Sequence, residues 1–185
     1  MVDKEQILKT FRENFGYSGN ITIDDKTGLV SVTGDCKLIK HMPNGKLPVK
    51  FDKVEGNCNE MNLTTLEGSP KIIINRYFSC SYNKLTTLEH SPPSMNNHDF
   101  YCHTNPLINL NGLPENINNL YIHYSPNLPI LKAVLNSKLI QWCNNDTPKI
   151  VRVLTNQYCG QGKAKMAECA IELVKAGYAR NARLW

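Results

Sequence analysis

Residues 78–88 read Phe-Ser-Cys-Ser-Tyr-Asn-Lys-Leu-Thr-Thr-Leu, and residues 100–110 read Phe-Tyr-Cys-His-Thr-Asn-Pro-Leu-Ile-Asn-Leu, so one pattern returns after 22 residues. Four cysteines follow the same interval: Cys36, Cys58, Cys80 and Cys102. Leucines follow Cys58, Cys80 and Cys102 after five and after eight residues: Leu63, Leu66, Leu85, Leu88, Leu107 and Leu110. A weaker copy begins at Leu120. A repeat with a fixed period of about 22 residues predicts a solenoid, in which each coil covers the hydrophobic face of its neighbour.

The spacing inside one repeat predicts what each coil buries. Phe78 and Cys80 are two residues apart and therefore share one face of a short strand. Stacking brings the same position of every coil into one interior column, so we expect the four cysteines to form a ladder of packed thiols. Asn83 and Asn105 are expected to turn the chain out of the strand while their amides satisfy buried backbone groups. Metal or redox use of the thiols is the alternative, but the close cysteine pairs of zinc sites are missing from the sequence.

The repeat resembles the leucine-rich repeat, Leu-x-Leu-x-x-Asn-x-Leu-x-x-Leu, with Phe and Cys in its first two apolar positions. This resemblance implies an α/β solenoid, a short leucine-rich-repeat-like stack with strands on one side and an extended return on the other. Residues 68–70 (Gly-Ser-Pro) and 91–93 (Ser-Pro-Pro) suit such a return, because proline is tolerated there. The resemblance informs the fold and does not by itself assign a function.

The open ends of a solenoid need caps, and the sequence predicts one at each end. Asp3-x-x-Gln6 resembles a capping box, and apolar residues at helical spacing behind it predict a helix over residues 4–15. Residues 21–32 read as a strand, a turn and a second strand. Thr147-Pro148 indicates the start of the first of two further helices. We therefore expect an N-terminal cap of helix plus β-hairpin over 1–50, the solenoid over 51–145 and a two-helix cap over 146–185, all in one structural unit.

Two segments outside the repeats carry a second resemblance. Residues 47–54 read Leu-Pro-Val-Lys-Phe-Asp-Lys-Val and lead into the coils, and residues 176–182 read Ala-Gly-Tyr-Ala-Arg-Asn-Ala near the end. With the repeats between them, these segments resemble a family of small proteins encoded by large tailed bacteriophages. The resemblance implies an accessory protein that acts inside an infected bacterium and binds, modulates or inhibits a host or defence protein.

Composition narrows the class of protein and its compartment. The chain has 185 residues and is 41% hydrophobic, which is enough for a packed core and argues against wholesale disorder. No apolar run approaches the roughly 18–20 residues that span a bilayer, so no membrane partner is expected. Seven cysteines, an odd number, and a charged beginning disfavour a secreted disulfide scaffold. We expect a cytoplasmic protein, in the host-cell cytoplasm if it is phage-encoded.

The alternation of the strands predicts an outward face. If Phe78 and Cys80 point inward, their neighbours point outward in three columns across the coils. These columns are Glu55, Tyr77, Asp99 and Asn119; Asn57, Ser79, Tyr101 and Tyr121; and Asn59, Ser81, His103 and His123. The later coils are rich in Tyr and His, which are typical of protein interfaces. The candidate protein-binding face is therefore Tyr77, Asp99, Tyr101, His103, Tyr121, His123 and Tyr124, although a merely polar sheet surface is the simpler alternative.

The charge of the chain is concentrated near its end. Residues 146–185 hold seven basic and three acidic residues, for a net charge of +4 out of +5. A basic segment attracts nucleic acid or acidic proteins, so the alternative hypothesis is nucleic-acid binding by the C-terminal helices. Its candidate residues are Lys149, Arg152, Lys163, Lys165, Arg180 and Arg183. Dispersed charges without aromatic stacking partners are equally typical of an ordinary helix surface.

No pattern in the sequence indicates catalysis. It contains no nucleophile and base set by a motif, no glycine-rich phosphate loop and no paired carboxylates at fixed spacing. His103 and His123 with Asp99 could be imagined as a metal or acid–base site, but no third ligand has a forced position. We expect no enzyme activity, no cofactor, no metal and no small-molecule substrate. The prediction is a non-enzymatic protein-binding module, with a self-assembling structural component as a further alternative.

Overall fold

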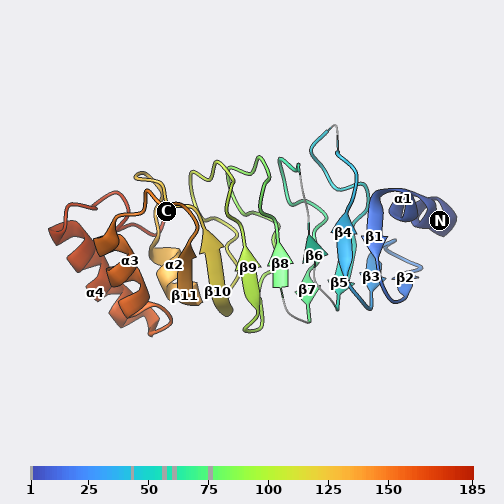
Figure 1. The fold of residues 1–185 in the computed structure, drawn as a ribbon. Helices are drawn as coiled ribbons and strands as arrows, with labels where there is room; N and C mark the ends of the chain where they lie inside the picture. Colours follow the sequence, from blue (N-terminus) through green and yellow to red (C-terminus); the bar gives the residue numbers. More distant parts are fainter. Residues whose placement is uncertain (1, 43, 56–57, 60–61, 75–76) are drawn as a thin grey trace.

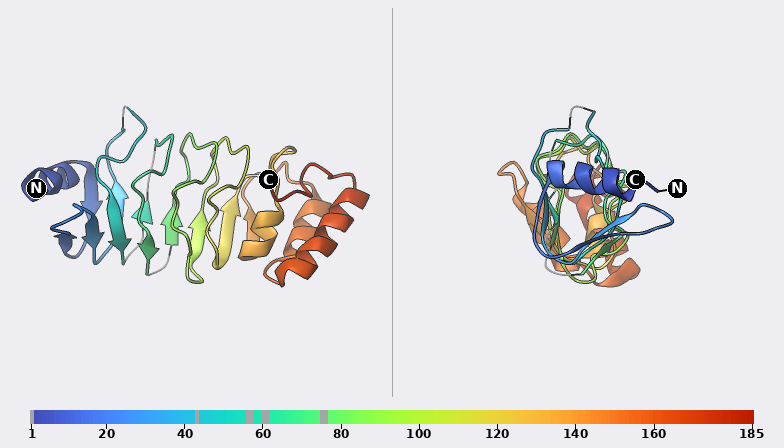
Figure 2. Two further views of the ribbon diagram at one scale, coloured as in Figure 1. Left: turned by 180° about the vertical axis from the view of Figure 1, so that it is seen from behind. Right: turned by 90° about the vertical axis from the view of Figure 1, so that its right-hand side faces the viewer.

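Short strands stack along the chain into a β-solenoid of about five turns with a period of about 20 residues, and helices lie at both ends (Figure 1). The computed structural model describes residues 2–42, 44–55, 58–59, 62–74 and 77–185. Figure 2 shows the N-terminal helix at one end of the stack and the remaining helices at the other. The solenoid predicted from the repeats is therefore confirmed.

The strands form two sheets along the stack. The seven-stranded sheet, here the long sheet, has the order β1 (Phe15–Tyr17), β4 (Cys36–Leu38), β6 (Cys58–Asn59), β8 (Tyr77–Ser79), β9 (Asp99–Tyr101), β10 (Ile117–Ile122) and β11 (Ser137–Trp142). The four-stranded short sheet has the order β2 (Ile21–Ile23), β3 (Val30–Val32), β5 (Phe51–Val54) and β7 (Ile72–Ile73). Among the described strands, β1–β4 and β2–β3 pair antiparallel. The other pairs are parallel, because their strands come from successive coils that run in the same direction. In the early coils, the segment that returns from one long-sheet strand to the next is thus itself a strand of the short sheet. The sequence did not predict the strand β7 there.

The coils are not equally long, and this changes the predicted cysteine column. Cys36 lies opposite Cys58, at an offset of 22 residues, but Cys58 lies opposite Phe78, at an offset of 20. The offset returns to 22 between Phe78 and Phe100. The prediction of one continuous column of four cysteines is therefore wrong. The register tolerates the shorter coil because side chains alternate with a period of two, so a two-residue shift leaves the same face inside.

Apolar side chains fill the space between the sheets. Phe78 and Phe100 are fully buried, and their rings stack with centroids 5.7 Å apart. A second aromatic cluster closes the N-terminal end, where Phe11 stacks on Phe15 at 4.9 Å and Phe15 meets Phe51 edge-on at 5.3 Å. Aromatic pairs of this kind add to the stabilisation from area burial alone. The core therefore runs continuously from the first helix into the coils.

Two buried or half-buried asparagines join neighbouring coils, and we call them the asparagine clamps. Asn83 Oδ1 accepts from the backbone N–H of Leu63 at 2.6 Å, and its Nδ2 donates to the carbonyl of Cys80 at 2.7 Å. Asn105 Oδ1 accepts from the N–H of Leu85 at 3.0 Å, and its Nδ2 donates to the carbonyl of Cys80 at 2.8 Å. The role predicted for Asn83 and Asn105 is confirmed, since each amide satisfies backbone groups where the strand ends.

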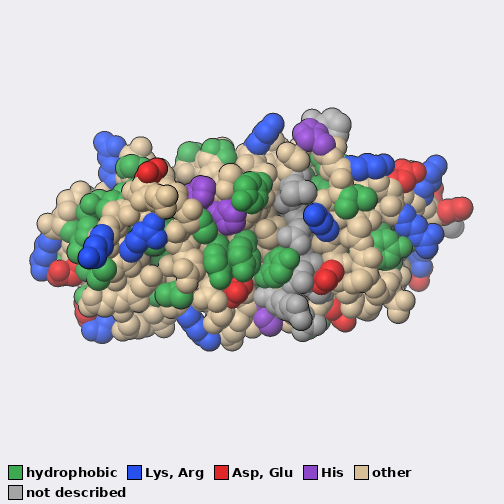
Figure 3. Space-filling model, viewed as in Figure 1, with side chains coloured by type: hydrophobic (Ala, Val, Ile, Leu, Met, Phe, Trp, Pro, Cys, Tyr) green, Lys and Arg blue, Asp and Glu red, His purple; other side chains and the backbone are tan. Residues whose placement is uncertain are grey.

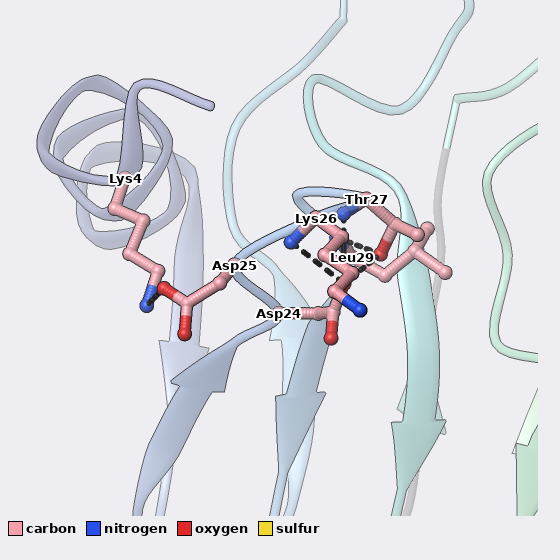
Figure 4. A network of polar contacts seen from close by, with 6 residues as sticks. All are labelled: Lys4, Asp24, Asp25, Lys26, Thr27 and Leu29. Carbon is pink, nitrogen blue, oxygen red and sulfur yellow. Dashed lines mark hydrogen bonds and ion pairs between the residues drawn. The ribbon is translucent and has the colours of Figure 1, made fainter. Parts of the chain in front are cut away.

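The N-terminal cap begins with helix α1 (Lys4–Asn14), whose first turn is capped by Asp3, since Asp3 Oδ1 accepts from Gln6 N–H at 2.9 Å. The β2–β3 turn packs beside this helix, and Lys4 forms an ion pair with Asp25 across the gap (Figure 4). Within the turn, Asp24 Oδ1 accepts from the Thr27 hydroxyl at 2.6 Å and from the Thr27 N–H at 2.7 Å. These bonds hold the pKa of Asp24 below its usual value.

Three helices close the other end: α2 (Leu131–Asn136), α3 (Lys149–Tyr158) and α4 (Gly162–Lys175). Trp142, at the end of β11, is buried, and its indole N–H donates to Thr155 Oγ1 at 3.3 Å. Asn181 is buried beyond α4, where its Nδ2 donates to the carbonyl of Leu128 at 2.8 Å. The chain therefore folds back after α4 and ties its last segment to the loop before α2.

Candidate protein-binding face

Three tyrosines from consecutive strands of the long sheet form one line on its outer face, and we call them the tyrosine ridge. Tyr77 from β8 meets Tyr101 from β9 edge-on, with ring centroids 5.4 Å apart. Tyr101 stacks on Tyr121 from β10 at 4.1 Å, with the rings 5° from parallel. All three are half-buried. Figure 3 shows hydrophobic side chains gathered over these strands, next to two histidines. The strand register places Tyr121 opposite Tyr101, whereas Tyr77 lies opposite Asp99 and reaches Tyr101 diagonally.

The Tyr101 hydroxyl, at the middle of the ridge, is uncharged at neutral pH. Burial raises the pKa of the Tyr101 hydroxyl well above its usual value, and the hydrogen bond with Tyr121 raises it further. Ring stacking and the hydrogen bond between the two hydroxyls also restrict the rotamers of Tyr101 and Tyr121. The result is a fixed aromatic surface that carries polar atoms at its tips.

Asp99 lies along one edge of the ridge, directly opposite Tyr77 in the neighbouring strand. Its Oδ1 accepts from three groups of β10: the Asn118 amide at 3.1 Å, the Asn119 backbone N–H at 3.1 Å and the Asn119 amide at 2.8 Å. The carboxylate therefore fastens β9 to β10. The predicted column of Tyr77, Asp99 and Asn119 is confirmed as a row of neighbours.

His103 and His123 lie along the other edge of the ridge, and we call them the histidine pair. Their ring centroids are 5.7 Å apart. Burial, and then the nearby His123, lower the pKa of His103 below its usual value, so its ring is neutral at pH 7. Tyr82 covers His103 edge-on at 5.1 Å and is 64% exposed. The sequence prediction missed Tyr82, because this residue follows the strand end, where alternation no longer places side chains.

The structure corrects two residues of the predicted outward columns. Glu55 does not stand beside Tyr77: it follows β5 of the short sheet, where its backbone N–H donates to Val32 and its carboxylate pairs with Lys53 at 2.6 Å. Ser81 is buried rather than outward, because the strand ends before it and Tyr82 takes a left-handed φ of 60°.

Two further members of those columns belong to the part of the chain that is only partly described. Asn57 lies outside the described residues. The backbone of Asn59 pairs with Ser79, so Ser79 stands between Asn59 and Tyr101 in the sheet. The register therefore places the backbone of Asn59 in the row of Ser79 and Tyr101, and not in the predicted column with Ser81, His103 and His123.

Tyr124 sits apart from the ridge, at the junction with the C-terminal cap. Its ring meets Trp142 edge-on at 5.9 Å, and its hydroxyl donates to Asn181 Oδ1 at 3.2 Å. The Tyr124 backbone is held by Asn144, which accepts from its N–H at 2.7 Å and donates to its carbonyl at 3.1 Å. Tyr124 is therefore committed to joining the last coil to the cap.

A shallow hollow of about 330 Å³ lies at the N-terminal side of the ridge. Tyr77 lines it together with Tyr17, Lys37 and Ile39. Tyr17 and Ile39 are 40% and 56% exposed, so apolar surface continues beyond the ridge along the same sheet.

The arginines among the candidate nucleic-acid-binding residues bind oxygens of the chain itself. Arg152 donates to the carbonyls of Trp142, Asn144 and Thr147. Arg180 donates to Asn127 Oδ1 at 2.6 Å, and Arg183 donates to the Arg180 carbonyl at 2.9 Å.

The lysines of that set lie on the helix surface. Lys165 pairs with Glu168 at 2.7 Å, in the i,i+3 relation of helix neighbours. Four of the six basic residues are thus engaged by oxygens of the chain itself, and Lys149 and Lys163 are exposed on the helices.

The described residues contain no group of three or more His, Cys, Asp or Glu side chains placed to hold a metal ion. Within the same ranges, no helix has both the length and the apolar character needed to cross a membrane. No known protein family, curated protein or solved structure matches the chain.

Proposed function

We propose that this protein is a non-enzymatic protein-binding module that docks its partner on the tyrosine ridge and the histidine pair. The observation that carries the proposal is the aromatic run on the outer face of the long sheet, in which Tyr77 meets Tyr101 edge-on and Tyr101 stacks on Tyr121. Tyrosine offers a large contact area with few rotatable bonds, and its hydroxyl supplies a polar contact at the rim. Such residues are enriched among those that carry most of the binding energy in protein interfaces.

The ridge is already ordered before any partner arrives. Ordering a flexible side chain at an interface costs about 0.5–1.5 kcal/mol, and stacked rings on a sheet avoid most of this cost. Solenoids commonly use an extended strand surface for binding, and here the aromatic residues concentrate on one part of that surface.

The proposal extends to the family of the protein and the place where it acts. The repeat pattern resembles the leucine-rich repeat, and residues 47–54 and 176–182 support a relationship with accessory proteins of large tailed bacteriophages. On this proposal the protein acts in the cytoplasm of an infected bacterium, where it binds and inhibits or otherwise modulates a host or defence protein.

Affinity capture from lysate of infected bacteria, with and without nuclease treatment, tests the proposal, with mass spectrometry to identify bound proteins. The ridge variant Tyr101→Ala/Tyr121→Ala should weaken capture at least about 30-fold, since interface hot spots are worth about 2 kcal/mol or more. A matched control, Ile72→Ala/Ile74→Ala, removes exposed apolar side chains from the short-sheet side and should leave capture unchanged.

A further variant distinguishes loss of the binding face from unfolding of the Tyr101→Ala/Tyr121→Ala protein. Ser79→Glu adds a charged side chain beside Tyr101 without removing any packed ring, and it should also block capture. Capture that survives both ridge variants, with melting temperatures showing folded proteins, would refute the proposed face. Capture that disappears only after nuclease treatment would favour nucleic-acid binding instead.

A further inference from the structure

One residue, Thr104, positions both rings of the histidine pair. Its hydroxyl lies 3.0 Å from His103 Nδ1, and its backbone N–H donates to His123 Nδ1 at 3.3 Å. Thr104 takes a left-handed φ of 57°, which directs its backbone N–H toward the next coil. The two rings are therefore held in one orientation by groups that belong to the chain.

These bonds determine which nitrogens are left for a partner. A backbone N–H can only donate, so His123 Nδ1 is an unprotonated acceptor and the neutral ring carries its hydrogen on Nε2. In His103 the Nδ1 atom is likewise engaged, by the Thr104 hydroxyl. Among the residues that the structure describes, no hydrogen bond engages Nε2 of either ring. The Nε2 atoms of the two neighbouring rings therefore take part in no hydrogen bond within the described residues, and His123 Nε2–H can donate to a partner.

This arrangement favours an oxygen acceptor over a metal ion. A metal would need the lone pair of His123 Nε2, and that nitrogen carries the proton as long as Thr104 donates to Nδ1. A carboxylate oxygen, in contrast, accepts from an Nε2–H group without any rearrangement.

The surrounding charge also favours an anionic group. The adjoining segment 146–185 carries a net charge of +4, and Lys and Arg side chains lie over the C-terminal helices on the same face as the histidines (Figure 3). Asp99, the acid within the described strands of this sheet, lies on the far edge of the ridge and is bonded to β10. Complementary charge of this kind selects partners and orients them.

We propose that the partner is an acidic protein segment that places an Asp or Glu carboxylate on the Nε2 edge of the histidine pair and an apolar side chain on the tyrosine ridge. This inference rests on the proposed function, since it assigns the chemistry of the partner for the same face.

A displayed library of random dodecapeptides, selected on the full-length protein, tests this assignment. Selected peptides should combine Asp or Glu with an aromatic or aliphatic residue. His123→Leu and His103→Leu should each weaken the selected peptides about tenfold, whereas His123→Gln, which keeps an N–H donor near the Nε2 position, should stay within about threefold. Melting temperatures of the variants show that the sheet is intact.

A double-mutant cycle makes the test specific. Replacing the selected acid, Glu→Gln or Asp→Asn in the peptide, should cost about tenfold with the unaltered protein and much less with His123→Leu. Additive effects, or selected peptides without acids, would overturn the assignment. If binding depends on Tyr101 and Tyr121 but not on the histidines, the docking face stands and only the acidic partner is refuted; if it depends on neither, both proposals fail.

Discussion

Replacing Asn83 by alanine removes the first of the two asparagine clamps of the solenoid. The side chain is 6% exposed, and its loss leaves the Leu63 N–H without the acceptor that lies 2.6 Å away. The carbonyl of Cys80 also loses a donor, but it keeps the bond from Asn105 at 2.8 Å. One hydrogen bond is worth about 1 kcal/mol net, and a buried donor left unsatisfied costs about 1–3 kcal/mol. The expected destabilisation is therefore about 2–4 kcal/mol, a large part of the roughly 5–15 kcal/mol that holds a typical domain folded.

Urea unfolding, followed by circular dichroism and by tryptophan fluorescence, measures this cost. Asn105→Ala should cost less than Asn83→Ala, because Asn105 is only half-buried and water reaches the groups it leaves. Asn109→Ala is the surface control. Its Oδ1 accepts only from the Asn111 N–H in an exposed turn, so its loss should cost less than about 0.5 kcal/mol.

The order of the three costs is the critical result. If Asn83→Ala matched Asn109→Ala, with an unchanged dependence of free energy on urea, the clamps would not stabilise the stack. The same reasoning would fail if the two probes gave different midpoints for the unaltered protein, because a two-state free energy would then be undefined.

Three further predictions concern a turn, a thiol and a carboxylate. A Cβ at Gly112 would lie 2.1 Å from the Leu88 carbonyl oxygen, so Gly112→Ala should cost more than about 3 kcal/mol. Gly177→Ala, with a similar φ but open space, should cost about 1 kcal/mol by the same urea assay. Cys143 is exposed and Cys102 is buried, so iodoacetamide followed by mass spectrometry should find Cys143 modified first; equal rates would contradict the burial. The Thr27 bonds lower the pKa of Asp24, so its contribution to stability is present at neutral pH and is lost as the pH falls through its folded-state value. The difference in urea midpoint between the unaltered protein and Asp24→Ala should accordingly shrink on going from pH 7 to about pH 2, and a constant difference would contradict the prediction.

The repeat made the solenoid and its clamps predictable, because both follow from local spacing. Asn83 and Asn105 occupy one position of the pattern, and that position leads directly to a turn with buried backbone groups. The coil that joins Cys58 to Phe78 was not predictable in the same way. A coil shorter by two residues keeps the alternation of inward and outward side chains, so the cysteine spacing of 22 does not reveal it.

The binding face was predictable only where strand alternation governs. Tyr101 and Tyr121 lie within strands and stand where the alternation places them. Tyr82 and Thr104 follow strand ends and take positive φ angles, so alternation does not apply to either. Tyr124 was assigned to the face by its neighbours in the sequence, but Asn181, from the far end of the chain, binds its hydroxyl. Contacts over such long sequence distances leave no local pattern.

The asparagine clamps have a direction, and this bears on how the chain folds as it leaves the ribosome. Asn83 satisfies Leu63 of the preceding coil, and Asn105 does the same for Leu85. The coils of Leu63 and Leu85 therefore keep an unsatisfied backbone N–H until the ribosome has delivered the coil that follows. Asn144 closes the series by holding Tyr124 from the C-terminal side. In a nascent chain, the unsatisfied backbone N–H groups consequently lie in the coil nearest the exit tunnel. In the coils released earlier, the clamps already bind these groups.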